Sequence, residues 1–190
     1  MSIDVDIIPS CSQLPTWGDI RQRLLADDLT IEGRRLLGPE PRLHKYGSHT
    51  QVEPTERLDP EGHYYFGLAD NNTLSLHVHP ITDDTEARDF VEDFARNLGS
   101  EDKEVWISAW ERSGFKYQVG SFGGRHEFEL FLFVNLVAVV CELAAGIVMV
   151  TEEGWFGVHV GLYPAAEFRK SGYEWWRRYL NERRRTSPCT

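Results

Sequence analysis

The sequence predicts an α+β fold: a mostly antiparallel sheet of hairpins with helices packed on it, one of them long and buried. Two patterns support this prediction. Apolar residues recur at helical spacing in several segments, and short segments with apolar–polar alternation come in pairs joined by turn residues. Hairpins place their strands antiparallel, and amphipathic helices must bury their apolar faces against the sheet. The 190 residues are expected to form one domain, residues 1–190.

Two helices are predicted in the first half of the chain. Residues 17–29 form the first, with Thr16 as its N-cap and Asp19 in its first turn. Residues 84–98 form the second, because apolar side chains recur there every three or four positions. Between them, residues 30–61 are rich in proline and glycine, which predicts a long connection with short strands.

Three hairpins are predicted from alternation flanked by turn residues. Their strands cover residues 64–68, 74–79, 104–110, 115–119, 147–150 and 155–162. Turn residues separate the members of each pair at 70–73, 113–114 and 151–154.

A long apolar stretch at residues 130–150 predicts the buried helix. Asn135, Glu142 and Gly146 are its only departures from apolar character. Its length would suit a bilayer, but Glu142 would cost on the order of 2–3 kcal/mol inside one. We therefore expect a buried helix of about 20 residues, roughly 30 Å long, followed by a central strand. Phe131, Asn135, Ala138 and Glu142 share one stripe of this helix, which is expected to be wet or tightly packed.

The C-terminal part is expected to contain two helices. Pro164 opens a short helix that runs to Lys170, since proline is favoured at a first helical position. Ser171 and Glu174 then form a capping box for a separate last helix.

The net charge of −10 is divided unevenly along the chain. Residues 169–190 contain seven basic and two acidic residues, so this basic C-terminal helix and tail carries +5 and residues 1–168 carry −15. An acidic protein is a poor ligand for nucleic acid and for anionic membranes, because both need cationic surfaces. The basic helix is expected to neutralise part of the acidic surface within the chain or in another copy, so a homo-oligomer is one alternative.

The cysteines and the first residues predict a cytoplasmic protein without cofactors. Cys11, Cys141 and Cys189 lack the spacing of metal ligands, and Cys141 is expected to be a small buried hydrophobe. The first residues include neither the basic segment nor the apolar run of a signal peptide.

Residues 82–104, which we call the acidic segment, hold nine acidic and three basic residues. Such a surface either serves solubility or steers a basic protein partner towards the chain. The predicted partner-binding residues are six acids and two aromatic anchors: Asp83, Asp84, Asp89, Glu92, Glu101, Asp102, Trp106 and Trp110.

Two alternatives involve small ligands. His77 and His79 lie two residues apart on a predicted strand, so their rings share a face and could chelate a metal, with His63 on the partner strand. Gly123, Gly124 and Arg125 precede the buried helix, where backbone N–H groups favour anions such as phosphate. Neither a dinucleotide fingerprint nor a P-loop is present. Ser121 lacks a nucleophile motif, so we expect a binding protein, with an enzyme that uses the glycine-rich turn 120–125 or the His77/His79 pair as the alternative.

One part of the sequence is similar to a known class of proteins. A Gly-Gly-Arg turn leads into an apolar helix, followed by a break at Gly146, an apolar strand, and an acidic turn before Trp155. Over about 35 residues this order resembles the C-terminal half of small acidic bacterial immunity proteins encoded beside polymorphic toxins. The resemblance implies a cytosolic α+β protein that binds and occludes a cognate toxin and has no catalytic residues.

Overall fold

The computed structural model describes residues 3–26, 30–31, 34–35, 41–68, 71–81, 89, 92–93, 108, 111–121, 127–152 and 158–186. In chain order the elements are β1 (Ile3–Ile8), α1 (Trp17–Ala26), β2 (Thr30–Ile31), β3 (Arg34–Arg35), β4 (Arg42–Lys45), β5 (His63–Leu68), β6 (Asn71–Pro80), β7 (Phe115–Ser121), α4 (Glu127–Leu143), β8 (Ile147–Val150), β9 (Gly161–Tyr163) and α5 (Ala165–Thr186).

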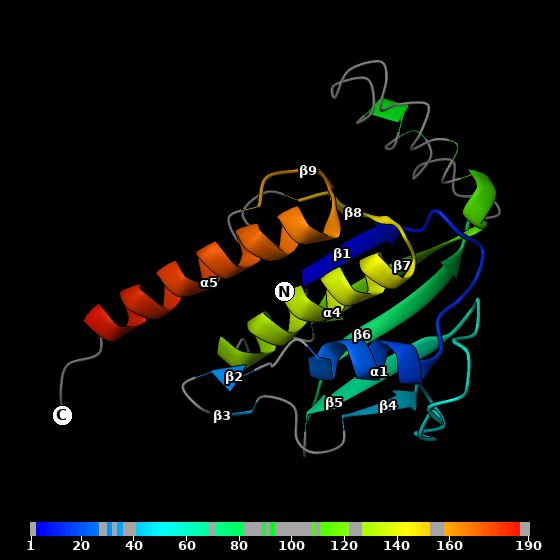
Figure 1. Cartoon of the computed structure of the whole chain (residues 1–190), viewed down its shortest axis with the longest axis horizontal. Helices are drawn as coiled ribbons and strands as arrows, with labels where there is room; N and C mark the ends of the chain where they lie inside the picture. Colours follow the sequence, from blue (N-terminus) through cyan, green and yellow to red (C-terminus); the bar gives the residue numbers. More distant parts are fainter. Residues whose placement is uncertain are drawn as a thin grey trace.

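Seven strands form one sheet in the order β4-β5-β6-β7-β1-β8-β9, and every neighbouring pair is antiparallel. β2 and β3 pair separately. The N-terminal strand β1 lies between β7 and β8 in the middle of the sheet (Figure 1). The predicted antiparallel α+β class is therefore confirmed. β1 is not among the predicted strands, although apolar and acidic residues alternate along most of it.

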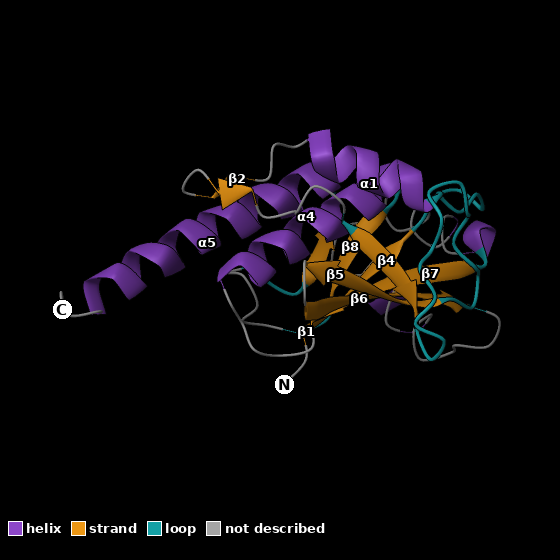
Figure 2. Cartoon of the chain, turned by 90° about the horizontal axis from the view of Figure 1, so that it is seen from below, coloured by secondary structure: helices purple, strands orange, loops and turns teal. Residues whose placement is uncertain are grey.

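Helices α1, α4 and α5 lie together on one side of the sheet (Figure 2). Tyr64, Leu76, Val119 and Val5 occupy matching positions on four adjacent strands, and all four are buried. Successive strand residues point to opposite faces, so the residues between them form the other face. On β5, β6 and β7 that other face is largely polar and partly exposed.

α4 is the predicted long buried helix, with 17 residues instead of about 20. Ala145 follows its end in the left-handed conformation, with φ of 46°. The Gly146 N–H donates to the Cys141 carbonyl oxygen at 2.9 Å, which closes the last turn. A Cβ on Gly146 would lie 2.4 Å from the Ile8 carbonyl oxygen, so glycine is needed where the chain turns beside β1. No helix in the described ranges has both the length and the apolar character to cross a membrane.

α1 begins at Trp17, directly after the predicted N-cap Thr16. The Asp19 N–H donates to the Thr16 hydroxyl oxygen at 3.1 Å, and the Thr16 N–H donates to the Asp19 carboxylate at 2.9 Å. This reciprocal pair satisfies two donors at the helix start. The described helix covers Trp17–Ala26, and residues 27–29 of the predicted helix lie outside the described residues.

The predicted strand at residues 104–110 is wrong at Ser108, which is helical, as are residues 111–113. The Arg112 side chain donates to the Ser108 carbonyl oxygen at 2.9 Å. A strand there could not form the predicted hairpin with β7, because β7 is already paired on both edges, with β6 and β1. The rest of 104–110 lies outside the described residues.

The two predicted C-terminal helices are one continuous helix, α5, so the predicted break before Ser171 is wrong. Gly172 has a role in packing within this continuous helix. A Cβ at this position would lie 2.7 Å from the Val134 methyl groups, so the Ser-Gly step allows close contact between α5 and α4. The step is a packing feature rather than a helix boundary.

Two other strand boundaries differ from the prediction. β6 begins at Asn71, so residues 71–73, predicted as a turn, belong to the strand. The pairing of β5 with β6 shifts between Phe66 and Gly67, which accommodates the longer strand. β9 contains only three residues instead of the predicted 155–162, and residues 153–157 lie outside the described part.

Candidate functional site

Three histidines gather on the polar face of the sheet. His63 of β5 lies directly opposite His77 of β6, and His79 follows on the same face. The rings of His63 and His77 stack with their centroids 4.3 Å apart and their planes 6° apart. The His79 ring lies 5.8 Å from that of His63 and 5.6 Å from that of His77. We call these three residues the histidine cluster; it confirms the predicted common face.

The pKa values of two members of the cluster are lowered. Burial, together with the neighbouring His63 and His79, lowers the pKa of His77 to about 4. Burial also lowers the pKa of His79, together with the nearby charge of Lys116. The Lys116 ammonium itself pairs with the Asp6 carboxylate at 3.1 Å. Burial therefore disfavours the charged forms of His77 and His79, which lie beside this ion pair.

The ring orientations do not suit a shared metal ion. The nitrogen lone pairs of imidazole lie in the ring plane, so two parallel stacked rings direct them along parallel planes. Within the described ranges, no group of three or more His, Cys, Asp or Glu side chains is placed to hold a metal ion. The alternative site at His77 and His79 stays a prediction.

A surface cavity of about 340 Å³ opens beside the cluster. Its walls are Lys45, Tyr46, Asp59, Glu61, Gly62, His63 and Tyr64, and we call it the Tyr46 cavity. The Tyr46 side chain is 59% exposed, the one strongly exposed large apolar residue among those described. Its ring centroid lies 5.0 Å from that of Tyr65 and 6.3 Å from that of His63. The Tyr65 and His63 rings therefore lie beside the exposed Tyr46 ring.

The turn opposite Tyr46 is fixed by hydrogen bonds. The Asp59 N–H donates to the Tyr64 hydroxyl at 2.6 Å, and the Glu61 N–H donates to the Asp59 carboxylate at 3.0 Å. The Gly62 N–H donates to the Asp59 carbonyl oxygen at 2.8 Å. The Tyr46 N–H donates to the His63 carbonyl oxygen at 2.8 Å, which fixes the other wall. The cavity is therefore formed by ordered backbone on both sides.

A second cavity, of about 260 Å³, lies at the start of α1. Its lining includes Cys11, Thr16, Asp19 and Arg57. Thr16 and Asp19 are already engaged in capping the helix. The Arg57 guanidinium donates to the Leu14 carbonyl oxygen at 3.4 Å. These polar groups serve the local fold.

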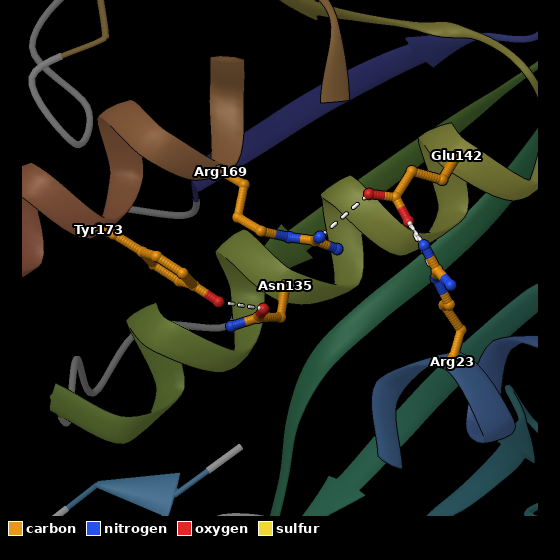
Figure 3. A network of polar contacts seen from close by, with 5 residues as sticks. All are labelled: Arg23, Asn135, Glu142, Arg169 and Tyr173. Atoms are coloured by element: carbon orange, nitrogen blue, oxygen red, sulfur yellow. Dashed lines mark hydrogen bonds and ion pairs between the residues drawn. The ribbon is translucent and has the colours of Figure 1, made fainter. Parts of the chain in front are cut away.

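A polar network joins α4 to the two helices beside it (Figure 3). The Glu142 carboxylate receives Arg23 of α1 at 3.1 Å and Arg169 of α5 at 3.0 Å. One acidic residue of the body therefore holds a basic residue of the C-terminal helix.

The stripe of α4 that contains Glu142 also contacts α5 through residues that lie one turn or more before Glu142. The Tyr173 hydroxyl donates to the Asn135 side-chain oxygen at 2.6 Å, and the Asn135 amide donates to the Phe131 carbonyl oxygen at 2.8 Å. The Phe131 ring stacks on Tyr173 and touches Trp176. The stripe predicted as wet or tightly packed is the contact with α5.

The predicted partner-binding and anion-binding residues are mostly outside the described part. Asp89 and Glu92 lie in helical segments, with Asp89 exposed and Glu92 half-buried. The others are Asp83, Asp84, Glu101, Asp102, Trp106 and Trp110 in the acidic segment and the residues after it, and Gly123, Gly124 and Arg125 before α4.

Comparisons with protein-family models, with curated protein sequences and with solved structures found no match to the chain. The site is therefore interpreted from its own residues.

Sequence reasoning did not find the Tyr46 cavity. Its walls come from two segments, 45–46 and 59–64, that approach each other only through the pairing of β4 with β5. A signal was present, because Asp59-Pro60-Glu61-Gly62 is an acidic turn sequence directly before an aromatic run.

Proposed function

We propose that this chain is a non-enzymatic protein-binding module whose partner is basic. The observation that carries the proposal is the separation of charge. The acidic segment has nine acids against three bases, whereas the basic residues concentrate in α5. Arg169 of α5 is bound to Glu142, so part of the positive charge is offset within the chain. A surface whose charges have one sign attracts a partner of opposite charge and accelerates the encounter between the two proteins.

Three buried or half-buried polar groups are held by contacts within the fold, which is consistent with a structural rather than a catalytic role for them. Of those described, Glu142 binds two arginines, Asn135 binds Tyr173, and the buried Glu129 carboxylate accepts a hydrogen bond from Ser121. These three groups each have a structural partner, whereas the buried Tyr117 hydroxyl has no hydrogen-bond partner among the described residues. Neither of the two cavities combines a serine or cysteine nucleophile with a histidine base.

The resemblance to immunity proteins suggests the class of partner. Such a protein would cover the active surface of a basic toxin domain, with the acids of the acidic segment steering the encounter. Trp106 and Trp110 are then the proposed aromatic anchors.

Affinity capture with matched charge variants tests the proposal. The acidic-segment variant carries Asp83→Lys, Asp84→Lys, Glu101→Lys and Asp102→Lys. The dispersed-charge variant carries Glu53→Lys, Glu152→Lys, Glu167→Lys and Glu174→Lys, and changes the net charge equally. We expect a basic protein from the native host to be retained by the wild type and the dispersed-charge variant and lost from the acidic-segment variant.

Retention by all three proteins, or loss from both variants, would contradict binding through the acidic segment. Co-expression tests the immunity interpretation separately. The product of a toxin-like reading frame beside the gene should stop growth alone, and co-expression of this chain should restore growth. The acidic-segment variant should restore it less.

A further inference from the structure

We infer that the Tyr46 cavity binds an arginine side chain of the basic partner. This inference rests on the proposed function, but it concerns residues outside the acidic segment. The cavity combines an exposed aromatic ring with two carboxylates, Asp59 and Glu61, across an open volume of about 340 Å³. An aromatic face and a carboxylate within one cavity are the two groups that attract a guanidinium most strongly.

The charge of the cavity is negative despite its lysine. Lys45 forms an ion pair with Glu56, and this contact raises the pKa of the lysine. The pair leaves the Lys45 charge balanced, while Asp59 and Glu61 contribute two negative charges to the same cavity. Glu61 is exposed, and none of the ion pairs seen between described residues includes its carboxylate.

The Tyr46 ring is held ready for stacking. The ring centroids of Tyr65 and His63 lie 5.0 Å and 6.3 Å from that of Tyr46, and the Tyr46 backbone N–H donates to the His63 carbonyl oxygen. Burial and the neighbouring Tyr46 raise the pKa of Tyr65, so this supporting phenol stays neutral. A preorganised ring lowers the entropy lost on binding.

Arginine fits this arrangement better than lysine. A guanidinium is planar, so it can stack on the Tyr46 ring while its edge donates two hydrogen bonds to one carboxylate. An ammonium group is compact and strongly hydrated, and it makes only a point contact. The Tyr46 cavity should therefore discriminate between the two cations.

Titration of the full chain with a tetra-arginine peptide, followed by amide and ring NMR shifts, tests this inference. Tetra-lysine is the matched probe. We expect shifts at Tyr46, Glu61 and Gly62 with tetra-arginine at low salt, and an affinity about threefold or more above that of tetra-lysine. Tyr46→Leu and Glu61→Gln should each weaken tetra-arginine binding about two- to fivefold, whereas Glu53→Gln should not. Unchanged thermal midpoints show that the variants are folded.

Equal weakening by Glu53→Gln, equal affinity for both peptides, or shifts only elsewhere on the surface would overturn the inference. The charge variants described above keep the two proposals distinguishable. If the acidic-segment variant loses the partner while Tyr46→Leu and Glu61→Gln retain it fully, the proposed function stands and this inference is wrong. If Tyr46→Leu and Glu61→Gln weaken partner binding and the acidic-segment variant does not, the inference stands and the assignment of the acidic segment is wrong.

Discussion

The Glu142 carboxylate of α4 lies 3.0 Å from the Arg169 guanidinium of α5. The Arg169 side chain is only 19% exposed and that of Glu142 is 25% exposed, so the pair is partly shielded from water. Arg23 of α1 binds the same carboxylate from the other side. One residue therefore links three helices and fastens the basic helix to the acidic body.

Glu142→Gln should lower the free energy of unfolding by about 1–2 kcal/mol, because it leaves a partly buried arginine without its charged partner. Urea denaturation measures the change. In an Arg169→Met background the same substitution should cost clearly less, since the ion pair with Arg169 is already lost and only the one with Arg23 remains. Glu53→Gln, on an exposed loop, is the control and should have almost no effect. Equal costs for Glu142→Gln in both backgrounds would show that the pair contributes nothing.

The stability of the protein should fall in mild acid because of His77. Its folded pKa is about 4, below the ordinary value of 6.5, so the unfolded chain takes up the proton first. The stabilisation that comes from the lowered pKa of His77 is fully present above about pH 6.5 and is lost as the pH falls towards about 4. The free energy of unfolding at about pH 7.5 and about pH 5 measures this loss. His77→Gln should reduce the difference, and His159→Gln, at an exposed position, should not.

Gly172→Ala should destabilise the fold even though alanine favours helices over glycine by about 1 kcal/mol. The added methyl group would meet the Val134 side chain at 2.7 Å. Overpacking of this kind typically costs about 1–3 kcal/mol. Denaturation of the single and double variants measures the effect. The substitution should become harmless or stabilising in a Val134→Ala background, and a gain of stability in the wild-type background would refute the close contact.

The Cys141 thiol should be unreactive until the protein unfolds. Burial raises its pKa to about 12, helped by the neighbouring Glu142 charge, and its side chain is 1% exposed. Only the thiolate attacks a disulfide reagent. In a Cys189→Ser variant, Ellman's reagent should titrate one thiol, Cys11, in the native state and two in urea. Rapid native reaction of Cys11→Ser, Cys189→Ser protein would contradict the burial of Cys141.

Elements whose sequence pattern is local could be predicted. α4 follows from a long apolar stretch, β5 from a run of aromatic residues, and β6 from alternation of apolar and polar residues. The cap of α1 was also predictable, since Thr16 and Asp19 act within one turn.

Features that depend on distant contacts were not predictable. β1 acquires its central place only from its partners β7 and β8, and the close packing of Gly172 against Val134 joins segments far apart in the sequence. Within the candidate site, the common face of His77 and His79 could be predicted, because they are two residues apart on one strand. The Tyr46 cavity required knowing that residues 45–46 and 59–64 are neighbours in space.

The rate of association with the captured basic partner, measured by stopped flow across salt concentrations, tests the central proposal most directly. At low salt the acidic-segment variant should associate about tenfold more slowly than the dispersed-charge variant, because steering depends on where the charge lies. The difference should shrink as salt screens the field. Equal rates for the two variants at low salt would contradict recognition through the acidic segment.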